Sequence, residues 1–358
     1  MKKYMFVVPS FASGGAERAV ANLSSELAAQ GEDVTVVIYF KMPDEYYVNS
    51  RVKVINLSGG NMEKYDSLSY LKKIRMLRHI MKEQNPDFIL PFLPQVTIHT
   101  TLAGFDMHNR IIHTVRNNPA LEPENKVKRN LCNLIVKHSW KTIVQNEKQR
   151  SFFPEKYRNK LFILFNPVSE ELMNTTPVDN LDTRTVIGVG RLSNQKNFSL
   201  LINAFNNVAK KLPGIQLKIF GEGEEKEKLQ NLICSLKAED EITLMGRNGD
   251  MKSVYESASL FVLSSNYEGM PNTLIEAMAV GLPCISTDCE TGPSDLIDNE
   301  ISGLLIPVGD QTALENAIYR VLENSEIAKN FGENAKKKIR EVCTVSSIVH
   351  SLKQICER

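Results

Sequence analysis

The feature that most constrains this chain is a strand, turn and helix pattern that repeats along most of its length. Its strands are short, continuous apolar runs rich in β-branched residues, such as residues 34–40. A strand without polar alternation is buried on both faces, which is typical of a parallel sheet covered by helices. The pattern therefore predicts an α/β fold of doubly wound, Rossmann-like parallel sheets, with ligands at the carboxyl ends of the strands.

The expected elements fall into two series. Strands are expected at residues 4–9, 34–40, 52–56, 88–91, 111–115, 142–144 and 162–165, and then at 186–189, 216–220, 242–245, 260–263 and 284–287. Helices are expected at residues 16–30, 68–82, 124–137 and 147–153, and then at 198–212, 224–236, 250–257, 272–280, 310–323, 326–340 and 345–355. A Pro-, Asn- and Asp-rich break at residues 166–184 separates them.

The length also favours two domains, because 358 residues exceed what one hydrophobic core usually holds. We predict an N-terminal domain over residues 1–165, a linker over 166–184 and a second domain over 185–340. Six scattered cysteines without zinc-site spacing indicate reduced thiols and a cytoplasmic protein. No signal peptide is recognisable, and the longest uncharged run, residues 88–105, is too polar to span a bilayer.

The charge is divided unevenly between the two halves. The formal net charge is only +1, yet residues 1–165 hold 24 Lys/Arg against 15 Asp/Glu, a net +9, and the remainder carries −8. This asymmetry predicts an anionic partner for the first half. Nucleic acid is not expected, since no nucleic-acid-binding motif is present.

Three motifs follow expected strands and precede expected helices. Gly14-Gly15 lets the backbone approach a ligand, and the next helix N-terminus favours an anion; the alternative is a plain turn with Glu17 favouring the helix dipole. Arg191 and Lys196 flank the first turn of the second domain, where two cations would clamp a pyrophosphate without a metal. The alternative for this pair is two solvated surface charges.

The third motif holds two carboxylates, Glu268 and Glu276, after the strand at residues 260–263. Glu276 lies in an otherwise apolar helix, where a carboxylate is costly unless it meets a partner or a ligand. Two acids at one strand end are able to hold two hydroxyl-bearing groups of one ligand. The alternative is a capping carboxylate and an exposed helix Glu.

In this order and spacing, the motifs resemble those of the retaining glycosyltransferases of family 4, which have the GT-B fold. The resemblance runs nearly end to end and rests on Gly14-Gly15-Ala16-Glu17-Arg18, Gly190-Arg191-Leu192 with Lys196-Asn197, Gly221-Glu222-Gly223, Leu244-Met245-Gly246-Arg247, the Glu268/Glu276 pair and Gly303-Leu304-Leu305-Ile306-Pro307. The segment 114–119, Thr-Val-Arg-Asn-Asn-Pro, looks like that of bacterial enzymes of surface-polysaccharide and lipid-linked-oligosaccharide assembly.

The resemblance implies a UDP-linked hexose or N-acetylhexosamine as donor and the two facing domains of a GT-B fold, with residues 341–358 packing back on the first. Arg191 and Lys196 would bind the pyrophosphate, and Glu268 would face the sugar. The remaining donor contacts would come from Gly14, Gly15, Gly246, Asn272, Thr273, Leu274 and Glu276, with Glu276 on the ribose. No cofactor or metal is expected, because the two cations would replace a divalent ion.

One position departs from the family pattern. Many members carry a His near the donor sugar where this chain has Arg116, and His113 lies three residues earlier inside an apolar strand. A lone strand His is more often a core residue than a catalyst. Arg116 would hold the donor or an acceptor phosphate, although it is a poor general base because it stays protonated.

The basic helices suggest an acceptor on polyprenyl diphosphate at the inner membrane face, where the protein would be peripheral. Membrane-facing cations are expected at Lys72, Lys73, Arg75 and Arg78, with an apolar side formed by Leu71, Ile74, Leu77 and Ile80 or Met81. A solvated basic face is the alternative. Three other functions stay open: a GT-B epimerase, a phosphorylase, or a non-catalytic sugar-nucleotide sensor.

Overall fold

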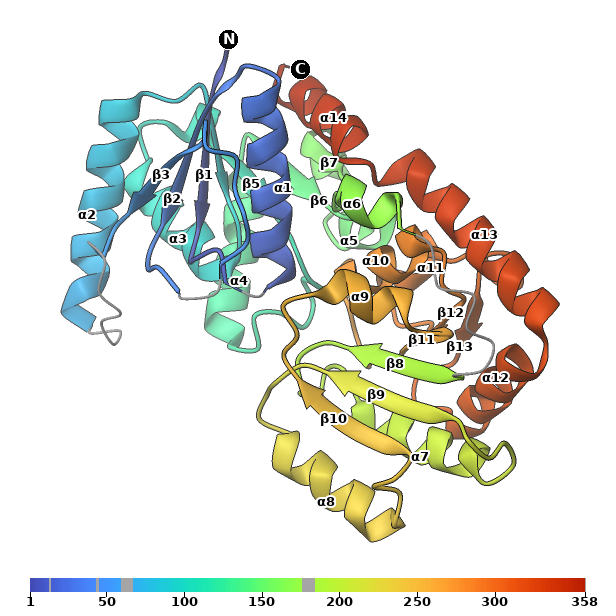
Figure 1. Ribbon diagram of the computed structural model, residues 1–358. Coiled ribbons are helices and arrows are strands. Elements are labelled where there is room, and N and C mark those ends of the chain that lie inside the picture. Colours follow the sequence, from blue (N-terminus) through green and yellow to red (C-terminus); the bar gives the residue numbers. More distant parts are fainter. Residues whose placement is uncertain (13, 43–44, 59–66, 176–183, 358) are drawn as a thin grey trace. The chain divides into compact units, whose positions relative to one another are not determined.

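The computed structural model describes residues 1–12, 14–42, 45–58, 67–175 and 184–357. It consists of two compact units. Unit 1 comprises Met1–Pro167 together with Val345–Arg358, and unit 2 comprises Val168–Thr344. Each unit is built on parallel strands with helices on both faces, as the continuous apolar strands predicted (Figure 1).

The described residues of unit 1 form seven parallel strands. The first four lie in the order β3 (Lys53–Asn56), β2 (Asp33–Ile38), β1 (Lys3–Val8) and β4 (Phe88–Pro91). The next three, β5 (Ile112–Thr114), β6 (Lys141–Val144) and β7 (Leu161–Ile163), continue beyond β4, because a parallel bridge joins Ile89 to Ile111. The order therefore reverses between β1 and β4.

The helices of unit 1 cover two large apolar cores and a smaller cluster of Val136, Val144, Phe153 and Leu161. These helices are α1 (Gly15–Ala29), α2 (Ser67–Gln84), α3 (Pro94–Ala103), α4 (Lys126–His138), α5 (Glu147–Ser151) and α14 (Val345–Glu357), with short 3₁₀ turns η1 (His108–Arg110) and η2 (Glu155–Lys160). Alternate residues of β1 face the two cores: Phe6 packs with α1 and α14, whereas Met5 packs with α2 and α3.

Helix α14 completes unit 1 from the far end of the sequence. It packs beside α1 (Figure 1), and the Lys141 ammonium donates to the carbonyl oxygens of Ile355 and Cys356 at 2.7 and 3.1 Å. Lys353 adds an ion pair with Glu32 at 2.8 Å. A cation on the last carbonyls satisfies acceptors that a helix end otherwise leaves unpaired.

In the part of unit 2 that the structure describes, six parallel strands lie in the order β10 (Ile242–Gly246), β9 (Gln216–Phe220), β8 (Thr185–Val189), β11 (Leu260–Leu263), β12 (Cys284–Thr287) and β13 (Leu304–Ile306). Its helices are α6 (Glu170–Met173), α7 (Phe198–Ala209), α8 (Lys226–Leu236), α9 (Met251–Glu256), α10 (Asn272–Val280), α11 (Pro293–Leu296), α12 (Gln311–Glu323) and α13 (Ser325–Val342). The strand order reverses between β8 and β11, which is where such sheets bind ligands.

Several sequence-based expectations need correction. The uncharged run at residues 88–105 contains helix α3, which begins with Pro94 at its first position, and the expected linker contains helix α6. The rest of that linker, residues 176–183, lies outside the described residues. No helix in the described ranges is long and apolar enough to cross a membrane.

The apolar side of α2 is also placed differently from the prediction. Leu77, Ile80 and Met81 are buried in the unit 1 core, and Ile74 packs against it, so among the five expected residues only Leu71 is exposed. These side chains have already left water for the protein interior. Helix α2 therefore does not present the predicted apolar stripe to a membrane.

The close approach of two turns in unit 2 gives a stability prediction. Gly221 has φ +145°, and a Cβ there would lie 1.8 Å from the Gly190 carbonyl oxygen. We expect Gly221→Ala to lower the free energy of unfolding by about 3 kcal/mol, because backbone has to move. Gly214→Ala is the matched control. Gly214 also has a positive φ, +85°, but no atom lies within 4 Å of an added Cβ, so a loss of about 1 kcal/mol is expected. Equal losses in urea unfolding would contradict the clash.

Candidate functional site

The carboxyl ends of β8, β9 and β10 are tied together by main-chain hydrogen bonds. The Gly190 amide donates to the Phe220 carbonyl at 2.9 Å, and the Gly221 amide donates to the Gly246 carbonyl at 2.8 Å. Gly246 ends β10 with φ +71°. These bonds hold the three turns in a row along one edge of the sheet.

Two loops meet at the switch point of unit 2, one after β8 and one after β11. The Asn197 side-chain amide donates to Asn266 Oδ1 at 3.0 Å. The backbone N–H of Asn266 donates to the Gln195 backbone carbonyl at 2.8 Å. The Gln195 side chain donates in turn to the Tyr267 carbonyl at 3.0 Å. Asn197 also caps α7 from a left-handed conformation. The loops that carry Lys196 and Glu268 are thereby fixed to one another.

Lys196 and Glu268 form the central contact of this site. Lys196 Nζ lies 2.6 Å from Glu268 Oε1, and the two side chains are only 14% and 7% exposed. The Ser265 hydroxyl donates to the same oxygen at 2.6 Å, and the Thr291 hydroxyl donates to the Glu268 carbonyl. The structure thus brings together two predicted site residues that lie far apart in the sequence.

Glu276 is buried at the middle of α10, and Tyr255 of α9 is a hydrogen-bond partner of its carboxylate. The Tyr255 hydroxyl donates to Glu276 Oε2 at 2.8 Å, and both residues are buried. A carboxylate in an apolar helix requires a hydrogen-bond partner, and for Glu276 the phenol hydroxyl of Tyr255 is such a partner. At the start of α10, which no side chain caps, the Thr273 hydroxyl is buried and has no hydrogen-bond partner.

Arg191 differs from Lys196, although both follow β8. Its side chain is exposed, and no acidic side chain in the described part of the chain pairs with it. Of the two cations that follow β8, an acid therefore neutralises Lys196, whereas Arg191 is exposed to solvent.

Arg116 of unit 1 lies at the carboxyl-end edge of that unit's sheet. Its guanidinium carbon is 4.5 Å from the centre of the Phe92 ring, just beyond β4. The Nε and one terminal nitrogen are buried without a hydrogen-bond partner, and burial lowers the pKa of Arg116 to about 9. A buried guanidinium with unpaired donors is costly, and an anion would satisfy it.

Two histidines of unit 1 are buried. His113 lies inside β5, and burial lowers its pKa to about 4, so its imidazole is neutral at pH 7. His99 of α3 stacks on Tyr39 and shares a 2.9 Å hydrogen bond with the Tyr39 hydroxyl; burial lowers its pKa to about 4 as well. The sequence analysis did not single out His99, because α3 was not expected.

At the turn before α1, the side chain of Glu17 occupies the position where the motif predicted a bound anionic ligand. Gly14 is the N-cap of α1, and a Cβ on it would lie 2.0 Å from the Glu17 carboxylate. Glu17 therefore folds back over the helix start, as the alternative of a helix-favouring acid describes. Ser13 lies outside the described residues.

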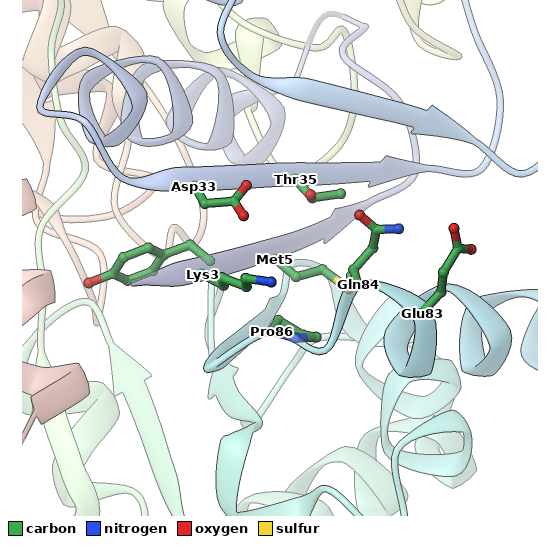
Figure 2. A pocket seen from close by; sticks show the side chains of 8 residues that line it. Lys3, Met5, Asp33, Thr35, Glu83, Gln84 and Pro86 are labelled. Carbon is green, nitrogen blue, oxygen red and sulfur yellow. The ribbon is translucent and has the colours of Figure 1, made fainter. Parts of the chain in front are cut away.

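One small pocket of unit 1 lies at the opposite edge of its sheet. Figure 2 shows Lys3 of β1, Asp33 and Thr35 of β2 and Gln84 of α2, which line this pocket. Its volume is about 110 Å³. These residues mark the amino ends of the strands, and the space is smaller than common ligand pockets of about 300 Å³ or more. This pocket is therefore not a candidate for the ligand site.

Few described side chains are candidates for binding a metal ion or for acting as a reactive thiol. Within the described ranges no three His, Cys, Asp or Glu side chains are grouped to hold a metal ion. The six cysteines are free, and burial together with the charge of Glu268 raises the pKa of Cys289 to about 12.

Comparison with known proteins identifies the family. Residues 13–172 match "Glycosyltransferase Family 4", and residues 173–338 match "Glycosyl transferases group 1". The chain belongs to this glycosyltransferase family. The predicted membership, GT-B fold and glycosyltransferase function are confirmed.

Full-length relatives come from bacteria. An alpha-1,4-N-acetyl-D-galactosaminyltransferase of Campylobacter jejuni, whose name specifies an undecaprenol diphosphate-linked acceptor, is 27% identical over 95% of this chain and 94% of its own. An amylovoran biosynthesis glycosyltransferase of Erwinia amylovora is 25% identical over 90% of both chains. An uncharacterized glycosyltransferase of Haemophilus influenzae is 28% identical over 94% of this chain and 95% of its own.

Solved structures share the fold across the whole chain. Anabaena HepE in complex with UDP and glucose gives a TM-score of 0.83 at 16% identity, and S. aureus TarM gives 0.82 at 17% identity; each comparison covers 100% of both chains. At this identity the likeness concerns the fold.

The buried ion pair gives a second stability prediction. Lys196→Met leaves the Glu268 carboxylate buried without its cation, so we expect the free energy of unfolding to fall by about 3 kcal/mol. Adding Glu268→Gln removes the unpaired charge while keeping an acceptor for Ser265, and should recover most of that loss. Additive effects of the two substitutions in urea unfolding would show that the residues are not coupled.

Proposed function

We propose that this glycosyltransferase uses a nucleoside diphosphate sugar, with UDP as the nucleotide, bound at the carboxyl ends of β8–β11. The observation that carries the proposal is the Lys196–Glu268 pair, fixed at the switch point beside the exposed Arg191. A diphosphate gains negative charge as its bond to the sugar breaks, and preorganised cations stabilise that charge. The UDP complexes of HepE and TarM support the choice of nucleotide.

We assign the remaining donor contacts to residues at the end of β10 and in α10, which follows β11, and to the turn before α1. Glu276 would accept hydrogen bonds from the ribose hydroxyls, with Tyr255 orienting its carboxylate. The unpartnered Thr273 hydroxyl, together with Asn272 and Leu274 at the start of α10, would meet the diphosphate, because a helix N-terminus favours an anion. Gly246 would lie beside the nucleobase, and Gly14 and Gly15 beside the phosphates.

Transfer would proceed without a metal and with retention of the anomeric configuration. Arg191 and Lys196 would take the role of a divalent cation, and Glu268 would face the donor sugar. The acceptor hydroxyl would attack the anomeric carbon on the face from which the diphosphate leaves. One C–O bond would form as the bond to the diphosphate oxygen breaks, and the leaving diphosphate would take up the hydroxyl proton.

The proposed acceptor is a glycan on polyprenyl diphosphate at the inner face of the cell membrane. The Campylobacter relative is named for such a substrate, and residues 1–165 carry the excess of positive charge that a diphosphate requires. Arg116 would bind a phosphate of the donor or the acceptor through its buried, unpaired nitrogens. Surface polysaccharide assembly is the process in which such an enzyme works.

The donor assignment is tested by Lys196→Ala. We expect kcat/KM to fall about a hundredfold, because one charge-stabilising donor is lost. Lys210→Ala, on the exposed end of α7, is the matched control and should keep wild-type activity. Stabilisation by UDP in a thermal shift assay should persist in EDTA.

Three outcomes contradict parts of the proposal. Loss of activity in EDTA removes the metal-free clamp, and an inverted product anomer in NMR removes retention. A new sugar nucleotide that forms without any acceptor indicates an epimerase instead of a transferase.

Arg116 and His113 are separated by paired substitutions. We expect Arg116→Gln to lower kcat/KM about a hundredfold and Arg116→Lys to recover part of it, because a point charge replaces a fork of donors. His113→Gln should keep most activity, since His113 is a neutral strand residue. If His113→Gln abolished transfer in a protein that still folds, the two roles would have to be exchanged.

A further inference from the structure

Helix α4 presents apolar side chains to solvent. Val127, Leu131 and Leu134 are 78%, 40% and 51% exposed, and their spacing of four and three residues places them on one face of the helix. The same helix buries only Val136 completely. We call these three residues the α4 face. A helix that exposes more large apolar side chains than it buries has an unsatisfied surface.

A hollow adjoins the α4 face. It has a volume of about 600 Å³ and is lined by residues of α4 and of the segment after α5, namely Asn130, Asn133, Leu134, Lys137, Phe152, Phe153 and Pro154. Phe152 is itself exposed, with its ring edge against Phe153. The apolar surface therefore extends from the helix into a depression beside it.

The surroundings of the α4 face are basic. Residues 121–160 hold ten Lys/Arg against four Asp/Glu. Two of the acids, Glu147 and Glu155, are paired with arginines of the same segment. Lys126 and Lys128 flank Val127 in solvent, and no acid in the described part of the chain pairs with either. Apolar side chains with unpaired lysines beside them match the chemistry of an anionic lipid surface.

Helix α2 lacks this combination. Its apolar side is in the core, and its Arg78 is bound to Asp106 at 2.7 Å and to the Ala103 carbonyl at 2.8 Å. Among the side chains of α2 that the structure describes, those of residues 70–84, Leu71 is the exposed large apolar one, at 61%.

We infer that the α4 face, with Phe152 and the flanking lysines, is the surface by which the protein docks on an anionic lipid bilayer. The apolar side chains enter the boundary between headgroups and acyl chains, and Lys126 and Lys128 meet lipid phosphates. The segment that carries Arg116 leads directly into α4 (Figure 1), so docking brings this edge of unit 1 to the membrane. The inference deepens the proposed function, because it rests on a lipid-linked acceptor.

The test is sedimentation of the full chain with vesicles of phosphatidylglycerol or of phosphatidylcholine. Wild type should bind the anionic vesicles, and binding should weaken as salt rises. Val127→Glu/Leu131→Glu should lower binding about tenfold or more, and so should Lys126→Glu/Lys128→Glu. Leu71→Glu on α2 is the matched control and should bind as wild type does. Fluorescence of Trp140, the single tryptophan, reports that each variant is folded.

The overturning results are distinct. Equal binding to both vesicle types, or no binding, removes the membrane as occupant, and loss of binding in Leu71→Glu alone assigns the surface to α2. A dimer that Val127→Glu/Leu131→Glu converts to a monomer identifies a second copy as the occupant. Transfer to a water-soluble acceptor should be unchanged in the α4 variants, whereas its absence in wild type contradicts the proposed function and leaves the vesicle result standing.

Discussion

The ion pair between Lys196 and Glu268 is the interaction on which the arrangement of the unit 2 site depends. It connects the loops after β8 and β11 where the strand order reverses, and 72 residues separate its members in the sequence. Neither charge is well exposed, so each requires the other. The amide contacts of Asn197, Asn266 and Gln195 hold the loops at the distance that the pair needs.

In unit 1 the cation at the sheet edge has buried nitrogens without a partner, in contrast to the ion pair of unit 2. Arg116 is packed over Phe92 with two unpaired nitrogens, and the structure offers these nitrogens no acid. An unpaired cation lowers stability until an anion arrives, whereas the paired cation of unit 2 is satisfied in advance. The two sheet edges therefore differ in how their cations are held: Lys196 of unit 2 is paired with an acid, and Arg116 of unit 1 has buried nitrogens without a partner.

The sequence predicted the fold well because its strongest signal was local. Continuous apolar strands such as β2 and β11 report burial on both faces without reference to distant residues. The partners in the site could not be predicted in this way. Tyr255 meets Glu276, and Gln195 meets Tyr267, only because the strand order brings their loops together. The exposed apolar face of α4 and the buried apolar face of α2 show the same periodicity in the sequence. Periodicity shows that a helix has an apolar side, but it does not show what covers that side.

The attachment of α14 to unit 1 has a consequence for synthesis of the chain. The core of that unit includes Ile348, Leu352 and Ile355, which leave the ribosome later than every described strand of unit 2. The described strands of unit 2 are therefore made before α14, and unit 1 is completed only after unit 2. Nascent chains that stop after residue 344 would hold a finished carboxyl-terminal unit and an amino-terminal one with an uncovered apolar surface beside α1, open to chaperones.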